Sequence, residues 1–261
     1  MSAAGDQPAV GDRGGAPATA VRNGAVGAAE GPRRPRLKVC GITNLEDAEL
    51  ATQLGAWTLG MIFYEGSPRR CSPARAQEIA AALRRRVGLC GVFVNAPLEQ
   101  VVGTCEQLGL GMVQLHGDEG PSFCAEVRRR SGARVAKAAQ VADAGDVRDV
   151  ERFHVDFHLL DARPRTAHGE RPRGGTGQTF DWTLLAGRTS DVPLILSGGL
   201  TSENVAEAIA VTRPFAVDTA SGTEAAPGRK DPERLRAFFD AVREGAGPVG
   251  SSEMSTAGLP A

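Results

Sequence analysis

The sequence predicts an α/β fold, a single-domain (β/α)8 TIM barrel in which a helix follows each strand. Eight short apolar runs rich in Val, Leu and Phe alternate with longer stretches of helical period. Strict alternation makes the strands parallel, because each helix returns the chain to the end where the next strand begins. The length of 261 residues suits one such barrel. An open doubly wound sheet fits less well, because residues 40–43 are not the glycine-rich dinucleotide turn that often follows its first strand.

The elements follow in order along the chain. Strands are expected at 37–40, 58–63, 89–93, 112–115, 135–138, 157–160, 194–196 and 215–218. Helices are expected at 44–54, 73–85, 98–108, 121–130, 204–211 and 232–244, with shorter and weaker ones after the fifth and sixth strands. Thr43 and Glu46 read as a capping box for the first helix, and Gly55 as its left-handed C-terminal residue. Ser72 followed by Pro73 is typical of an N-cap and a first turn.

Both ends of the chain lack a period of either 2 or 3.6. Residues 1–35 and 245–261 are rich in small and polar residues, so we expect a disordered leader and tail around a barrel at 36–244. The acidic residues Asp6, Asp12 and Glu30 argue against a transit peptide.

Composition restricts the class of ligand. Lys and Arg number 30 against 31 Asp and Glu, so the net charge of −1 offers no basic field for nucleic acid or a membrane surface. No apolar run is long enough to cross a bilayer, and no secretory signal opens the chain, so a cytoplasmic location is expected. Five cysteines without a CxxC pair indicate neither a disulfide scaffold nor structural zinc. We expect a small-molecule ligand and a monomer.

The functional residues of a TIM barrel follow the strands at their carboxyl ends. The polar residues at these places in the sequence are Cys40, Arg69, Asn95, Gln114, His116, Asp161, Ser197, Asp218 and Ser221. Gln114 either lines the pocket floor or satisfies a backbone group. His116 either polarises a ligand or hydrogen-bonds loop backbone, and we favour the second.

Glycines in two neighbouring loops predict a phosphate site. Ser197-Gly198-Gly199 and Ser221-Gly222 follow the seventh and eighth strands, where barrels commonly hold a phosphate on backbone N–H groups. A third glycine-rich segment, which contains Gly175, Thr176 and Gly177, lies in a long loop after strand six and is interpreted as a lid.

Cys40 and Asp161 are candidates for an acid/base pair. They end strands one and six, whose carboxyl ends face a common funnel. A thiolate can remove a carbon-bound proton if neighbouring cations bring its pKa toward neutrality. A partly desolvated Asp161 can remain protonated and donate.

Several segments, taken in order, resemble the phosphoribosylanthranilate isomerase family. Lys38-Val39-Cys40-Gly41-Ile42-Thr43 resembles the opening signature of that family. Further similar segments lie at 63–64, 67–69, 91–95, 113–119, 159–161, 174–177, 180–182, 196–200, 218 and 221–222, so the resemblance spans essentially the whole predicted barrel.

The resemblance implies an Amadori rearrangement of N-(5-phosphoribosyl)anthranilate without cofactor or metal. It further implies that Asp161 protonates the ring oxygen, that Cys40 removes the C2′ proton, and that Arg69 holds the anthranilate carboxylate. Arg70 follows directly, so the choice between the two arginines stays open. Gln114, Asp218, the two glycine loops and residues 175–177 complete the expected binding site.

Two other functions remain to be tested. The related sugar isomerase of histidine biosynthesis, or a bifunctional barrel, would resemble this chain but relies on an aspartate where Cys40 stands. A catalytically inert barrel that binds phosphorylated metabolites would need neither Cys40 nor Asp161.

Overall fold

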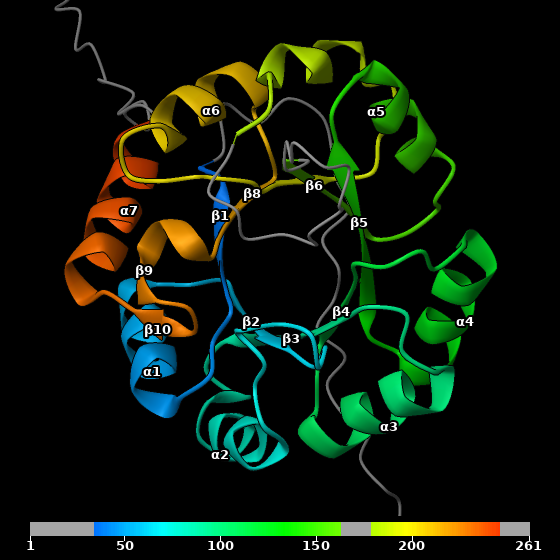
Figure 1. The fold of residues 1–261 in the computed structure, drawn as a ribbon, viewed down its shortest axis with the longest axis vertical. Helices are drawn as coiled ribbons and strands as arrows, with labels where there is room; N and C mark the ends of the chain where they lie inside the picture. Colours follow the sequence, from blue (N-terminus) through cyan, green and yellow to red (C-terminus); the bar gives the residue numbers. More distant parts are fainter. Residues whose placement is uncertain (1–33, 163–178, 246–261) are drawn as a thin grey trace, which may run out of the picture. The chain divides into compact units, whose positions relative to one another are not determined.

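Eight parallel strands close into a barrel in sequence order, and the helices surround it (Figure 1). The computed structural model describes residues 34–162 and 179–245. The strands are β1 (Arg36–Cys40), β2 (Thr58–Ile62), β3 (Gly88–Phe93), β4 (Met112–Leu115), β5 (Arg134–Val141), β6 (Phe157–Ala162), β7 (Leu194–Leu196) and β8 (Ala216–Thr219). Pairing of β8 with β1 closes the ring, so the predicted (β/α)8 barrel is confirmed.

The helices cover the outside of the barrel. They are α1 (Leu45–Leu54), α2 (Pro73–Leu83), α3 (Leu98–Leu108), α4 (Pro121–Ser131), α5 (Ala144–Glu151), α6 (Val205–Thr212) and α7 (Pro232–Gly245). In the described part of the segment between β6 and β7, residues 179–193, the helical element is a 3-10 helix, η1 (Trp182–Gly187). Helix α5 has 8 residues, so the short helix predicted after strand five is confirmed.

The predicted start of the first helix needs correction. Asn44, not Thr43, is the N-cap of α1, and its side chain accepts a hydrogen bond from the Asp47 backbone N–H at 2.9 Å. The Thr43 hydroxyl instead donates to the carbonyl of Gly228, 185 residues further along the chain. A long-range contact thus replaced the local capping box. The predicted left-handed Gly55 and the Ser72 N-cap are confirmed.

A short hairpin after β8 was not predicted. It consists of β9 (Glu224–Ala226) and β10 (Arg229–Lys230), and follows the 3-10 turn η2 (Ser221–Thr223). Its strands have three and two residues, too few for an apolar period to be recognised.

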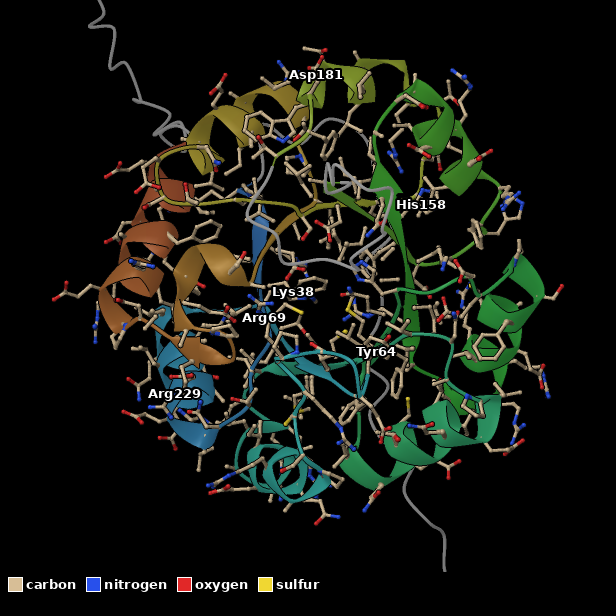
Figure 2. The ribbon with its side chains drawn as sticks, in the orientation of Figure 1. Lys38, Tyr64, Arg69, His158, Asp181 and Arg229 are labelled. Atoms are coloured by element: carbon tan, nitrogen blue, oxygen red, sulfur yellow. The ribbon has the colours of Figure 1, made fainter. Side chains whose placement is uncertain are left out.

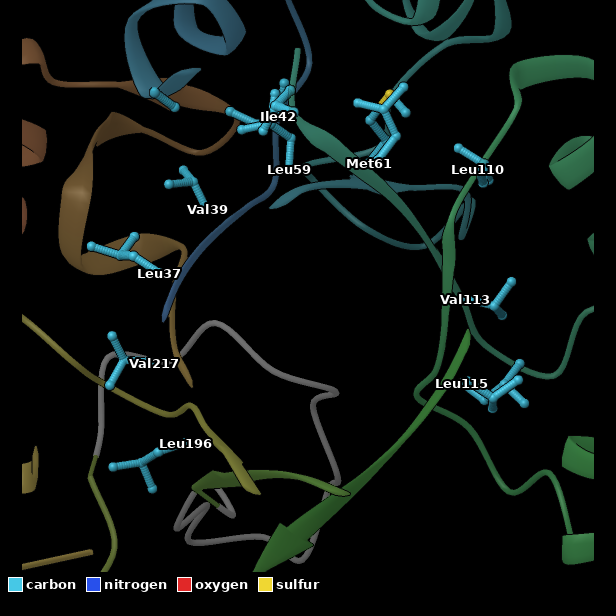
Figure 3. Close-up of a cluster of buried hydrophobic side chains, with 14 of the residues drawn as sticks. Leu37, Val39, Ile42, Leu59, Met61, Leu110, Val113, Leu115, Leu196 and Val217 are labelled. Carbon is cyan, nitrogen blue, oxygen red and sulfur yellow. The ribbon is translucent and has the colours of Figure 1, made fainter. Parts of the chain in front are cut away.

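Two apolar layers hold the barrel together. The larger layer lies between strands and helices, and Figure 3 shows its side chains, such as Val39, Leu59 and Val113, pointing outward from the strands. The second layer fills the barrel with side chains that include Met112, Phe157 and Ile195. Successive residues of a strand point to opposite faces, so Val39 faces the helices while Lys38 and Cys40 face the interior.

The ends of the chain lie mostly outside the described residues. The barrel elements run from Arg36 to Gly245. The leader expected at 1–35 is described only at Arg34 and Pro35, and the tail expected at 245–261 only at Gly245.

Candidate active site

Every described residue that the sequence analysis assigned to catalysis or binding lines one cavity of about 500 Å³ at the carboxyl ends of the strands. The predicted residues that line it are Cys40, Arg69, Gln114, Asp161, Ser197, Gly198, Gly199, Asp218, Ser221 and Gly222. His116 lines it too, whereas Asn95 after β3 does not and instead donates hydrogen bonds to Asp118 and Glu119. Residues 175–177, interpreted as a lid, lie outside the described residues. Six strands and two glycine loops therefore contribute to one pocket.

The Cys40 thiol occupies space that a glycine leaves empty. Cys40 of β1 and Gly60 of β2 are register partners, and a Cβ at position 60 would lie 2.8 Å from the Cys40 Sγ. Any side chain there would force the thiol to move. Gly60 is thus a positioning residue that the sequence analysis missed, although a lone glycine inside an apolar strand was an available signal.

An ion pair lies beside Cys40 in the barrel interior. Figure 2 places Lys38 within the ring of strands, and its Nζ donates to Asp218 Oδ1 at 2.9 Å. The other carboxylate oxygen, Asp218 Oδ2, accepts a hydrogen bond from the Ser197 hydroxyl at 3.4 Å. The sequence analysis named Lys38 only within the segment that resembles the family and did not predict it as part of the site, because a lysine in an apolar run gives no sign that it is buried.

Asp161 ends β6 under the loop that follows β7. A Cβ on Gly198 would lie 2.9 Å from Asp161 Oδ1 and would also collide with the backbone nitrogen of Ala162. Gly198 has a φ of +93°, which other residues rarely adopt. Glycine at this position therefore allows the loop to cross the end of β6 directly over the carboxyl group.

Two side chains of β4 and its loop contact the same region. His116 Nε2 lies 3.6 Å from Asp161 Oδ2, and the Gln114 side-chain nitrogen lies 2.8 Å from His116 Nδ1. Our preferred interpretation of His116, a loop residue bonded to backbone, missed both contacts. Gln114 lies in the cavity wall, which agrees with the first of its two interpretations.

Burial raises the pKa values of both catalytic candidates above their ordinary values. Desolvation, with the charge of Asp218 as the second cause, raises the pKa of Asp161 to about 7. The protonated form that a general acid requires is therefore well populated near neutral pH.

The pKa of the Cys40 thiol is raised, and not brought toward neutrality as a thiolate base would favour. Lys38 and Lys230 both lower it, as expected of neighbouring cations, but burial outweighs them and leaves the pKa above its usual value. The two lysines limit this rise. At neutral pH the thiolate is therefore the minor form.

The structure separates the two arginines that the sequence left as alternatives. Arg69 lines the cavity, and its guanidinium makes a two-pronged ion pair with Glu224 through Nε and Nη2. Arg70 is exposed and pairs with Glu65 at 3.3 Å. Only Arg69 lies where it could meet a ligand in this cavity.

Glu224 connects Arg69 to the hairpin after β8. Besides Arg69, it accepts hydrogen bonds from the backbone of Gly228 and from the buried side chain of Lys230. Lys230 also donates to the carbonyl of Ala220, in the loop that carries Ser221. Because the hairpin was not predicted, neither Glu224 nor Lys230 was predicted as part of the site.

The two glycine loops lie against each other. A Cβ on Gly222 would collide with the carbonyl oxygen of Leu200, so glycine is required for this approach. Ser197, Gly198 and Gly199 form the facing side of the cavity wall. The arrangement brings backbone groups from two loops to one end of the pocket, as an anion site requires.

The described residues contain neither a membrane-spanning helix nor a cluster of metal ligands. None of their helices is long and apolar enough to span a membrane. No group of three or more His, Cys, Asp or Glu side chains in this part of the chain could hold a metal ion.

Comparisons with known proteins agree with one another. The family model described as N-(5′-phosphoribosyl)anthranilate (PRA) isomerase matches residues 37–241. The N-(5′-phosphoribosyl)anthranilate isomerase of Pelobacter propionicus is 44% identical over 209 residues, which are 80% of this chain and 96% of that protein.

Solved structures of the same kind share the fold. The phosphoribosyl anthranilate isomerase of Thermotoga maritima is 40% identical, with a TM-score of 0.73 over 80% of this chain and 99% of that one. A phosphoribosyl anthranilate isomerase in complex with reduced 1-(o-carboxyphenylamino)-1-deoxyribulose 5-phosphate is 36% identical, with a TM-score of 0.70 and the same coverage.

Proposed function

Since this chain belongs to the N-(5′-phosphoribosyl)anthranilate isomerase family, we propose that Asp161 and Cys40 are the general acid and general base of its reaction. The chain is an isomerase of tryptophan biosynthesis that acts on phosphoribosylanthranilate. What supports the two roles is that both side chains line one cavity together with the glycine loops.

The proposed reaction is an Amadori rearrangement in which two proton transfers by the enzyme are followed by conversion of an enol to the ketone. Protonated Asp161 gives its proton to the furanose ring oxygen as the C1′–O bond breaks, which leaves a protonated Schiff base between C1′ and the anthranilate nitrogen. The Cys40 thiolate then removes the proton from C2′, and the electron pair neutralises the Schiff-base nitrogen. The resulting enol becomes the ketone as its hydroxyl proton leaves and C1′ gains a proton.

The buried environment suits this division of roles. Asp161 holds a proton near neutral pH because burial disfavours its charge. The thiolate of Cys40 is stabilised by Lys38 and Lys230. General acid and base catalysis of this kind contributes about 10²- to 10⁴-fold to rate.

Different parts of the cavity are assigned to the phosphate and to the carboxylate of the substrate. We assign the phosphate to the loops at Ser197, Gly198 and Gly199 and at Ser221 and Gly222, where two sets of backbone groups meet. The anthranilate carboxylate is assigned to Arg69, because Arg70 faces solvent. Gln114 and Asp218 complete the pocket wall, and Gly175, Thr176 and Gly177 are assigned to a lid on the sequence alone.

We also assign a monomeric, cytoplasmic state to the enzyme. All five cysteines are free thiols, which suits a reducing compartment. Sedimentation equilibrium at micromolar concentration would give the mass of one chain, and a dimer mass would overturn the assignment.

The reaction and its acid/base pair are tested by the fluorescence decay of freshly made phosphoribosylanthranilate. Wild-type enzyme should consume it rapidly, and Cys40→Ala and Asp161→Asn should each lose about 10²- to 10⁴-fold in kcat. Cys105→Ala is the matched control, because Cys105 is a buried thiol of α3 outside the cavity.

A second substrate separates the competing functions. The aminoaldose of histidine biosynthesis should not be turned over, and turnover of both substrates would indicate a bifunctional barrel. Unimpaired turnover in both variants would refute the assignment of Cys40 and Asp161, while an inactive wild type would indicate a binding protein.

A further inference from the structure

The Lys38–Asp218 ion pair is buried in the barrel interior and is not an exposed ion pair of the surface. The two residues are register partners on β1 and β8, and their side chains are 0% and 5% exposed. Removing two charges from water costs several kcal/mol per ion, and such a pair is often no more stabilising than apolar residues of equal size. Stability alone therefore does not explain a lysine and an aspartate in the barrel interior.

The order of the strands orients the ion pair, with Lys38 on the strand of Cys40 and Asp218 on a strand between Cys40 and Asp161. Lys38 lies two residues before Cys40 on the same inward face of β1. Asp161 is on β6, so β7 and β8 separate it from β1 in the ring. Asp218 of β8 therefore lies between the two, and Ser197 of β7 hydrogen-bonds its second oxygen.

We propose that the buried Lys38–Asp218 pair is a positioning element of the catalytic site, with its cation toward the Cys40 thiol and its carboxylate toward Asp161. This direction favours a thiolate on Cys40 and a proton on Asp161, which is the combination that the reaction uses. The inference rests on the proposed roles of Cys40 and Asp161.

The effects of Lys38 and Asp218 on the pKa values of the two catalytic candidates agree with this orientation of the pair. After burial, the largest influence on the pKa of Cys40 is Lys38, which lowers it, and Asp218 opposes with a smaller effect. After burial, the largest influence on the pKa of Asp161 is Asp218, which raises it, and Lys38 opposes with a smaller effect. Each end of the pair thus acts mainly on its neighbour.

This arrangement affects the fraction of enzyme that is ready to react. Burial alone favours the thiol over the thiolate. Each unit by which the pair reduces the gap between the pKa values of Cys40 and Asp161 increases the reactive fraction about tenfold between those two values. The expected consequence is that loss of the pair lowers kcat.

The experiment is a double variant, Lys38→Met/Asp218→Asn, which removes both charges and leaves neither one buried alone. The Cys40 titration is followed by the pH dependence of its alkylation by iodoacetamide, with the modified peptide resolved by mass spectrometry. The Asp161 titration is followed by the ¹³C resonance of its carboxyl carbon. Neither readout requires turnover, so failure of this inference is distinguishable from failure of the proposed function.

We expect the two titrations to move in opposite directions. The midpoint for Cys40 should rise and that for Asp161 should fall, each by about one unit, and kcat should then fall about 100-fold. A site merely loosened by the substitutions would admit water and lower both midpoints together, because burial raises both. Midpoints that move together, or not at all, would overturn the proposal.

A second buried ion pair provides the control. Lys137 and Glu119 lie 2.8 Å apart with side chains 5% and 3% exposed, on β5 and in the loop after β4. Lys137→Met/Glu119→Gln removes a pair of the same kind and should leave the Cys40 midpoint unchanged. If the double variant at Lys38 and Asp218 does not fold, Lys38→Met alone should raise the Cys40 midpoint, and a constant midpoint would refute the inference.

Discussion

At the end of the barrel where the strands begin, the interior is closed by aromatic rings, whereas at the end where they finish it is lined by charged side chains. Trp57, Phe157 and Phe215 contact one another with ring centroids 5.3–5.6 Å apart. Arg36 and Arg134 stack over these rings at 5.0–5.5 Å. Their guanidinium groups cover the apolar floor and remain at the surface.

The opposite end contains buried charges. Lys38 with Asp218, Arg69 with Glu224, and Asp161 are all at or near the cavity. Interactions of this kind contribute little net stability, whereas rings buried against one another contribute several kcal/mol. One barrel therefore separates the residues that maintain the fold from those that perform chemistry, and strand β6 carries both, with Phe157 at one end and Asp161 at the other.

The largest expected effect on stability is at the aromatic end. Phe157→Ala should reduce the free energy of unfolding by about 3–5 kcal/mol, because it leaves a cavity under Trp57 and Phe215. Urea unfolding followed by circular dichroism measures this loss. Turnover per folded molecule should change less than about twofold; a tenfold loss would show that the two ends of β6 are not independent.

At the charged end, the buried Asp161 should make the free energy of unfolding depend on pH. The folded-state pKa of Asp161 is raised to about 7 from 3.8, so the native state binds an extra proton between these values and wild-type stability falls as pH rises from 4 to 7. Above pH 7 the cost is complete, on the order of 4 kcal/mol. Asp161→Asn should therefore be more stable than wild type at pH 8 and nearly equal to it at pH 4. Parallel stability curves for the two proteins would contradict the buried acid.

The smallest expected effect separates the two neighbouring arginines. Arg69→Met should lower kcat/KM about 10- to 100-fold, because a hydrogen bond to a charged group contributes roughly 1.5–3 kcal/mol. Arg70→Met should leave kcat/KM within about twofold, because its partner Glu65 is exposed. Steady-state kinetics with phosphoribosylanthranilate measures both. Equal losses in the two variants would reopen the choice of carboxylate ligand.

The strands were predictable to within a few residues because each is a continuous apolar run. Six of the eight predicted strands agree with the observed element to within one residue at both ends, whereas β5 extends to Val141 and β6 to Ala162. A parallel strand that is buried on both faces is recognisable in the sequence as a continuous run of apolar residues. The hairpin β9–β10 leaves none, so Glu224 and Lys230 were missed with it.

The sequence by itself determined the barrel and the residues that line its cavity. Strict alternation of strands and helices fixes the direction of each strand, and a polar residue at a strand end must then face the common pocket. Cys40, Asp161 and the two glycine loops were identifiable for this reason.

Only the tertiary structure decided the electrostatics. Lys38 and Asp218 are 180 residues apart in the chain and meet because the barrel closes between β1 and β8. The raised pKa of Asp161 comes from burial beneath a loop of β7 and from Asp218. Desolvation and charge proximity depend on distances in space, and a linear pattern of residues carries no record of them.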